Sequence, residues 1–196
     1  MRAVTCDKGD STITINGLDA GNRLLQGWVR NQGAACTSAA ALAALAALGA
    51  TNLPQLGPAS IRLGASEEFG APSLLDYVSW PGRRAPLDLR LEALARESGI
   101  AISSRSQAVL PGWPLRLRPH EMLLAHLVWG QEAPGRRGAW GWRPLAPKTY
   151  STGGHTVVVA GIESGSWAVL DPNLSGIQNW PVPGIATAVT RIMPVS

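Results

Sequence analysis

Residues 153–172 read GGHTVVVAGIESGSWAVLDP, and this stretch decides the fold class that the sequence predicts. Within it, Thr156–Ile162 and Trp167–Leu170 are rich in β-branched and apolar residues, which is typical of strands. Glu163-Ser164-Gly165 lies between them and can form a three-residue turn with Gly at its last position. The stretch therefore predicts an antiparallel hairpin near the C-terminus of the sequence.

The length of this turn determines which side chains share a face of the hairpin. A three-residue turn places Ile162 opposite Ser166 and Val157 opposite Asp171, so that His155 and Asp171 become diagonal neighbours on one face. Such neighbours are roughly 7–8 Å apart at the backbone, within reach of a hydrogen bond between imidazole and carboxylate. A turn of two or four residues would put them on opposite faces, because side chains alternate along a strand. Taken alone, Asp171 would equally suit a turn residue.

The clearest helix in the sequence is Cys36–Leu48, which is rich in Ala and Leu and stops at Gly49. Cys36 begins this helix after a Gly-bearing loop, where the positive helix end and free N–H groups lower the pKa of a thiol. We expect the loop to leave the sulfur partly open and hydrolysis to be bell-shaped in pH. A lone Cys in an Ala-rich segment is also common as a small core residue. Leucines at helical spacing predict one buried stripe, formed by Leu42, Leu45 and Leu48.

The remaining pattern is helical first and β-rich later, which predicts an α+β fold. Further helices are expected at Pro72–Trp80, Leu87–Ser98 and Pro119–Trp129. Further strands are expected at Ser11–Asn16, Ile100–Ser104 and Ile185–Met193, with a loop or irregular strand pair at Gly130–Thr149. We predict one domain, residues 1–196, with a helical lobe at about 17–130 and a β lobe at about 131–196 that includes the N-terminal strand.

Composition narrows the possible partners. The 196 residues are 45% hydrophobic and 15% charged, as in a globular domain, and the net charge of +4 does not indicate a nucleic-acid partner. Two Cys and three His argue against a zinc site, and His120 and His126 point to different faces of the helix predicted there. We expect no metal, no cofactor and no membrane span. Met1–Asp10 has no apolar core of a secretory signal, so we expect a cytoplasmic protein or export without a cleaved signal.

Two passages resemble papain-like-fold cysteine peptidases, close to the bacterial C39-like group. They are VRNQGAACTSAAALAAL at 29–45 and the stretch 153–172, and they cover about a fifth of the sequence. In the order Cys36, His155, Asp171, the residues resemble that family's nucleophile, base and orienting acid. The resemblance implies a papain-like fold, in which a nucleophile helix packs against a β-rich lobe. It also implies hydrolysis of a peptide or isopeptide bond in a protein or peptide substrate through a thioester acyl-enzyme, without a cofactor.

The resemblance also suggests an oxyanion donor. In the family, a Gln upstream of the nucleophile shares this role with the main-chain N–H of the Cys, and Gln32 is the candidate, although it lies closer to the Cys than in the family pattern. Thr37-Ser38 departs from the small and aromatic residues usual after the nucleophile. We expect Gly153 and Gly154, which provide a flexible approach to His155, to contact substrate. Trp140 and Trp142 are expected to line a substrate groove.

Two alternatives remain open. Glutamine deamidases and transglutaminase-like proteins, many of them bacterial toxins or effectors, use the same triad order, and 153–172 also resembles their His–strand–Asp-Pro segment. The long interval between Cys36 and His155 favours the papain-like plan. A binding module with a degenerate site is the alternative of another class, favoured if Cys36 is buried away from His155. The sequence identifies no proteinaceous inhibitor.

Overall fold

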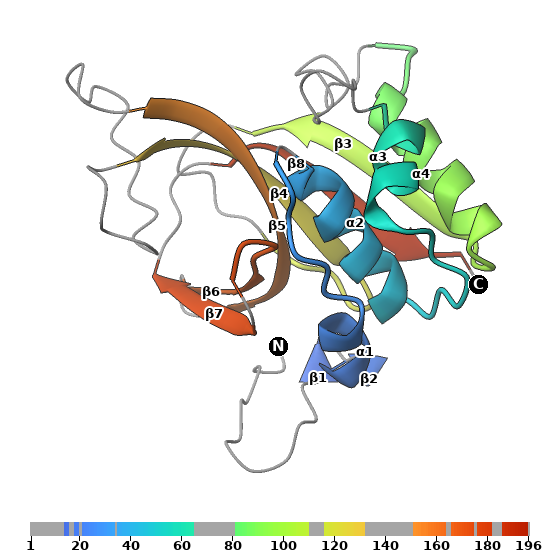
Figure 1. The fold of residues 1–196 in the computed structure, drawn as a ribbon, viewed down its shortest axis with the longest axis horizontal. Coiled ribbons are helices and arrows are strands. Elements are labelled where there is room, and N and C mark those ends of the chain that lie inside the picture. Colours follow the sequence, from blue (N-terminus) through green and yellow to red (C-terminus); the bar gives the residue numbers. More distant parts are fainter. Residues whose placement is uncertain are drawn as a thin grey trace.

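The computed structural model describes residues 14–15, 18–19, 21–33, 35–64, 81–109, 116–131, 151–163, 166–174, 176–181 and 186–195. Within them it has four helices and two antiparallel sheets (Figure 1). The helices are α1 (Gly21–Gln26), α2 (Cys36–Ala47), α3 (Leu56–Arg62) and α4 (Pro86–Glu97). The strands are β1 (Thr14–Ile15), β2 (Leu18–Asp19), β3 (Ile102–Ala108), β4 (Met122–Gln131), β5 (Ser151–Glu163), β6 (Ser166–Leu170), β7 (Ile177–Pro181) and β8 (Ala186–Pro194).

The larger sheet has six strands in the order β3-β8-β4-β5-β6-β7. Every neighbouring pair is antiparallel, and the sheet is open. The C-terminal strand β8 lies between β3 and β4, so strands far apart in the sequence become neighbours. The described part of the protein is therefore α+β, as the sequence predicts.

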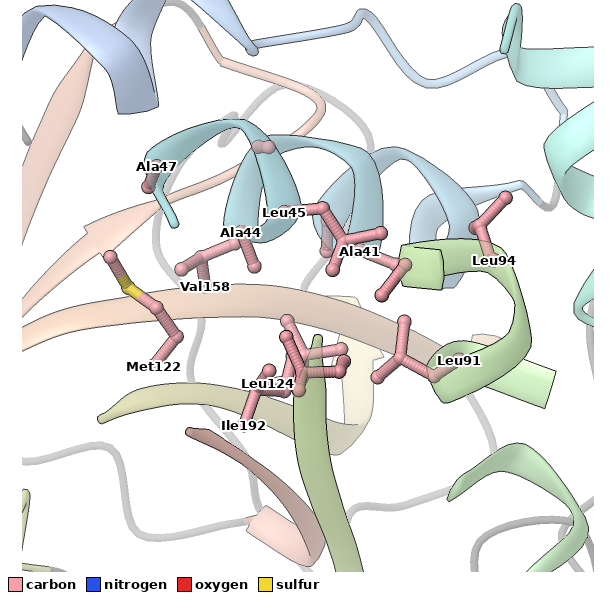
Figure 2. Packing of buried hydrophobic residues seen from close by; sticks show 14 of the residues in the cluster. Ala41, Ala44, Leu45, Ala47, Leu91, Leu94, Met122, Leu124, Val158 and Ile192 are labelled. Atoms are coloured by element: carbon pink, nitrogen blue, oxygen red, sulfur yellow. The ribbon is translucent and has the colours of Figure 1, made fainter. Parts of the chain in front are cut away.

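Helix α2 packs against β4 and β5, and α4 packs against β3 (Figure 1). Figure 2 shows the core between them, where Ala41, Ala44 and Leu45 of α2 lie above Val158 and Leu124 of the sheet. All but one of the residues of α2 are buried, so the prediction of a single buried stripe is wrong. Alanine explains the difference, because its small side chain lets neighbouring elements approach the helix from several sides.

Several predicted elements are confirmed. Helix α2 begins at Cys36 as expected, and α4 coincides with the helix predicted at Leu87–Ser98. Leu87, Leu91 and Leu94 form its buried face. Strands β5, β6 and β8 lie where the sequence predicts strands, and β3 extends the strand expected at Ile100–Ser104.

The helix predicted at Pro119–Trp129 is wrong, because this segment contains β4. Its side chains alternate between two cores: Met122 and Leu124 face the helices, and Leu123 and Ala125 face a second cluster on the other side of the sheet. A strand buried on both faces reads as a continuous apolar run, which periodicity alone does not distinguish from a buried helix.

The predicted lobe boundary is also wrong, because the large sheet already begins at Ile102, within the range assigned to the helical lobe. Strand β1, in the segment predicted as the N-terminal strand, pairs with β2 and not with the large sheet. Sequence reasoning missed β2, α1, α3 and β7. Pro72–Trp80 and residues 132–149 lie outside the described residues. Among the helices that are described, none is long and apolar enough to cross a membrane.

Candidate active site

The first component of the candidate site is the thiol at the N-terminus of α2. Cys36 is the first residue of the helix, and Ala35 before it provides no side-chain cap. The main-chain N–H groups in the first turn of a helix carry partial positive charge, which favours an anion. The side chain lies inside the protein, because Cys36 is only 7% exposed. The expectation of a partly open sulfur is therefore wrong.

The second component is the hairpin of β5 and β6, whose register differs from the predicted one at its tip. Glu163 pairs with Ser166, so two residues, not three, separate the paired positions. The register then shifts at Ala160, because Val159 pairs with Val169 while Gly161 pairs with Ala168. This extra residue on β5 compensates for the shorter turn.

As a result, β5 and β6 pair near the candidate site in the same register that the sequence predicts. Val158 pairs with Leu170, and one further step places Val157 opposite Asp171. His155 and Asp171 therefore share a face, and His155 Nε2 lies 2.8 Å from Asp171 Oδ1. Both side chains are buried, at 3% and 0% exposure. The predicted contact is confirmed, although the turn from which it was derived is wrong.

His155 also hydrogen-bonds the Cys36 thiol. Because Nε2 faces Asp171, Nδ1 is the ring nitrogen directed to the sulfur. The structure thus brings together the three residues Cys36, His155 and Asp171, which come from α2, β5 and the end of β6. Cys36 is buried beside His155 and not away from it, so the observation that would favour a degenerate binding module is not met.

The surroundings shift the pKa values of both His155 and Cys36. Burial lowers the pKa of His155, but hydrogen bonds and negative charge from Asp171 and Cys36 outweigh it and raise that pKa to about 9. Burial raises the pKa of Cys36, and the hydrogen bond and positive charge of His155, with hydrogen bonds from Thr156, outweigh it and leave that pKa lowered. These shifts favour a thiolate–imidazolium pair around neutral pH.

A set of hydrogen bonds ties the loop before Cys36 to the turn after Asp171. Trp28 Nε1 donates to the Asp171 carbonyl at 3.0 Å, and the Asn31 main-chain N–H donates to the Pro172 carbonyl at 2.9 Å. Asn31 Nδ2 donates to Asn173 Oδ1 at 3.0 Å. The Asn173 main-chain N–H donates to Asp171 Oδ1 at 2.7 Å, as in an Asx-turn. These contacts hold the acid in place. Sequence reasoning missed Trp28 and Asn31, because their partners lie more than 100 positions away.

Behind the site lies a buried polar row that the sequence did not reveal. Thr37 Oγ1 and Thr156 Oγ1 are 2.8 Å apart, and His126 Nδ1 is 3.0 Å from Thr156 Oγ1. His126 Nε2 is 2.8 Å from Thr190 Oγ1 on β8. Burial lowers the pKa of His126 to about 3, so its ring is neutral at ordinary pH. The alternation of β4 would have indicated this histidine as inward-facing, had the segment been recognised as a strand.

The other predicted site residues are placed as follows. Gln32 is exposed in the loop before α2, and its role as oxyanion donor stays a prediction. Gly153 and Gly154 lie within β5, paired with Trp129 and Val128, and their contact with substrate stays a prediction. Trp140 and Trp142 lie outside the described residues.

The described residues contain no group of three or more His, Cys, Asp or Glu placed to hold a metal ion. His120 is exposed in a turn with a positive φ of 62°, whereas His126 is buried in β4. The helix on which the two histidines were expected is absent from this segment.

The buried neutral His126 predicts an acid-sensitive fold. Its pKa is about 3 in the folded protein and about 6.5 in the unfolded protein. The unfolded state therefore binds the extra proton first, so the stability contribution is present above pH 6.5 and is lost as the pH falls toward 3, by up to about 1.4 kcal/mol per pH unit. Urea unfolding against pH should show a shallower acid slope for His126→Gln than for the wild type. His120→Gln, at an exposed position, should retain the wild-type slope, and equal slopes in all three proteins would contradict the prediction.

Comparison with known proteins identifies no relative: no protein-family model matches the sequence, and no curated protein matches it.

Proposed function

We propose that the protein is a cysteine peptidase that hydrolyses peptide or isopeptide bonds through Cys36, His155 and Asp171. The observation that carries this proposal is the position of His155, hydrogen-bonded to Asp171 on one side and to the Cys36 thiol on the other. A nucleophile, a base and a group that orients the base are the parts that thiol hydrolysis requires. The papain-like fold belongs to the same proposal. It is supported by a nucleophile helix that packs against the antiparallel strand carrying the base.

The mechanism begins from the thiolate–imidazolium pair. Cys36 Sγ attacks the carbonyl carbon of the scissile amide, and the main-chain N–H of Cys36 at the uncapped helix end stabilises the oxyanion. His155 transfers its proton to the leaving amine, which departs and leaves a thioester on Cys36. Water then gives a proton to His155 and attacks the thioester, which releases the carboxylic acid and regenerates the thiolate–imidazolium pair.

Asp171 stabilises the imidazolium form of His155 and holds the orientation of its ring. Its Oδ1 contacts His155 Nε2, which leaves Nδ1 toward the sulfur. The carboxylate is buried and is held by the Asn173 main chain, so it does not need to move during the reaction.

Active-site labelling tests the proposed nucleophile. We expect iodoacetamide or an epoxysuccinyl inhibitor to modify Cys36, as located by mass spectrometry, and to abolish hydrolysis of a denatured protein substrate. Modification of Cys36 with undiminished hydrolysis would contradict the proposal.

The products distinguish the peptidase from the deamidase or transglutaminase alternative. New peptide termini indicate attack on main-chain amides. Release of ammonia from glutamine side chains, without new termini, would replace the peptidase proposal by the alternative on the same triad.

A further inference from the structure

The loop that leaves α1 toward α2 is hydrogen-bonded to the turn that follows Asp171. This loop can be followed in Figure 1 as the blue trace that leaves α1. Trp28 Nε1 donates to the main-chain carbonyl of Asp171 at 3.0 Å, and the main-chain N–H of Asn31 donates to the carbonyl of Pro172 at 2.9 Å. Asn31 Nδ2 donates to Asn173 Oδ1 at 3.0 Å. We call these three hydrogen bonds the clasp.

On one side, the clasp reaches the imidazole of the site. The main-chain N–H of Asn173 donates to Asp171 Oδ1 at 2.7 Å, and the same oxygen lies 2.8 Å from His155 Nε2. Asn173 therefore accepts from Asn31 with its side chain and supports the acid with its main chain. A shift of this turn would move the carboxylate and, with it, the ring that the carboxylate orients.

On the other side, the clasp reaches the start of α2. Asn31 precedes Cys36 by a short stretch of loop, which is braced by two further hydrogen bonds. Asn31 Nδ2 also donates to the Gly33 carbonyl at 3.1 Å, and the Ala35 N–H donates to the Gln32 carbonyl at 3.3 Å. Gly33 has a φ of 63°, which glycine adopts readily, so the loop can turn sharply into the helix. The position of Asn31 is therefore passed on to the first residue of α2.

Trp28 fixes the clasp to the core of the protein. Its side chain packs against the larger hydrophobic cluster, to which α2 also contributes. Its main-chain N–H donates to the Leu25 carbonyl of α1 at 3.1 Å, and the neighbouring Leu24 is fully buried. An indole of this kind places an apolar ring in the core and directs one N–H at a chosen acceptor.

The packing of α2 by itself defines its position along β5 weakly. The hydrophobic effect is non-directional, and the face of α2 toward the sheet is mostly alanine (Figure 2). Hydrogen bonds are directional, so they decide where the helix starts relative to the strand. Thr37 joins α2 directly to Thr156 of β5, with 2.8 Å between the two hydroxyl oxygens. The clasp adds a second connection, which runs through the turn of the acid.

We propose that Trp28 and Asn31 are positioning residues: by clasping the turn after Asp171, they hold the start of α2 in place against the His155 ring, so that Cys36 and the imidazole meet. This inference rests on the proposed function in taking Cys36 as the nucleophile and His155 as its base. It goes beyond support of the acid, because it makes the reactivity of the thiol depend on the loop before α2.

Asn31→Ala is the first test, because it removes the side-chain bonds of Asn31 and leaves its main-chain N–H on Pro172. The rate of alkylation of Cys36 by iodoacetamide is measured against pH, with the label located by mass spectrometry. We expect the acid midpoint to move to higher pH, because a positive charge that is held less closely stabilises the thiolate less. Hydrolysis of a peptide substrate should show a kcat about tenfold lower with little change in KM, as for misplaced reacting groups.

A double-mutant cycle tests whether Asn31 acts through Asn173. Asn173→Ala removes the acceptor of the Asn31 amide and keeps the main-chain N–H that supports Asp171. It should shift the alkylation midpoint in the same direction as Asn31→Ala. The double variant should behave like Asn31→Ala alone, because the contact between the two side chains is already lost. Shifts that simply add would contradict the proposed contact.

A second background separates the thiol from the acid. An effect that only disturbs the carboxylate should vanish in Asp171→Asn, in which the carboxylate charge is already absent. An effect on the position of α2 should persist there, so Asn31→Ala should still shift the midpoint. Loss of the shift in the Asp171→Asn background would overturn the proposal.

Trp28→Phe tests the other half of the clasp. It keeps an aromatic ring in the core and removes the N–H that holds the Asp171 carbonyl, so the midpoint should again move to higher pH. Asn52→Ala is the matched control, since Asn52 is exposed beyond the opposite end of α2, and it should retain the wild-type profile.

If Asn31→Ala does not fold, Asn173→Ala at an exposed side chain carries the same test. A lower melting temperature with an unshifted midpoint in Asn31→Ala and Trp28→Phe would show a purely structural clasp and overturn the proposal. Alkylation reads the thiol and not the substrate. Shifted midpoints without peptide hydrolysis would therefore refute the proposed function alone, whereas peptide hydrolysis with unshifted midpoints would refute this inference alone.

Discussion

We expect Cys36→Ala to abolish hydrolysis of a protein substrate and to leave the melting temperature close to that of the wild type. The substitution removes the sulfur that forms the thioester, and loss of a nucleophile costs on the order of 10⁴-fold or more in rate. The thiol is small, so replacing it by a methyl group in the buried first turn of α2 leaves little empty volume. Residual hydrolysis and thermal unfolding of the same preparation measure the two effects.

Ser38→Ala is the matched control for this prediction. Ser38 lies in the same turn of α2 and is fully buried, and its hydroxyl has no hydrogen-bond partner within the described part of the chain. Removing an unsatisfied buried hydroxyl is neutral or stabilising, so this variant should retain activity. A collapsed melting temperature for Cys36→Ala would instead indicate a structural cysteine.

His155→Ala has the second large expected effect, because it removes both the proton donor and the charge that stabilises the thiolate. Loss of a general acid costs about 10²–10⁴-fold in rate. Burial still raises the pKa of Cys36, and nothing from His155 opposes it, so the acid limb of iodoacetamide alkylation should move to higher pH. His120→Ala, at an exposed histidine, should leave the profile unchanged. A thiol titration that is identical in the wild type and in His155→Ala would show that the two groups do not interact.

The pH profile of hydrolysis follows from the same pair. Activity requires thiolate and imidazolium together, so it should rise through the lowered pKa of Cys36 and fall as His155 loses its proton near pH 9. Asp171→Asn removes the negative charge that raises the pKa of His155, so the alkaline limb should move to lower pH. The apparent values belong to the coupled pair and not to either residue.

The local sequence predicted the structure correctly where a helix or strand depends mainly on the preferences of its own residues. Cys36–Ala47 is helical because Ala and Leu favour a helix and Gly49 provides the stop, with a φ of 101° that glycine adopts readily. The strands of the β5–β6 hairpin follow from their β-branched residues. The order of Cys36, His155 and Asp171, the proposed nucleophile, base and acid, was visible for the same reason, since each residue lies at or near the end of a recognisable element.

Local sequence failed where the partner of a segment decides its structure. The run that forms β4 reads as a helix until β5 and β8 are placed on either side of it. That error concealed His126, because a helix would not have aligned it with Thr156 and Thr190. The positions of Trp28 and Asn31 likewise depend on a turn at the other end of the chain.

The amino-acid sequence by itself determined that Cys36 begins a helix and that His155 and Asp171 lie on one hairpin, because backbone preferences of neighbouring residues decide both. Only the tertiary structure decided that the two side chains meet. The turn is one residue shorter than predicted, and the register shift at Ala160 compensates for it. Such a shift depends on how β5 packs between β4 and β6, not on the residues of the hairpin alone. Burial of the sulfur was decided at the same level, because it requires elements that only folding brings together.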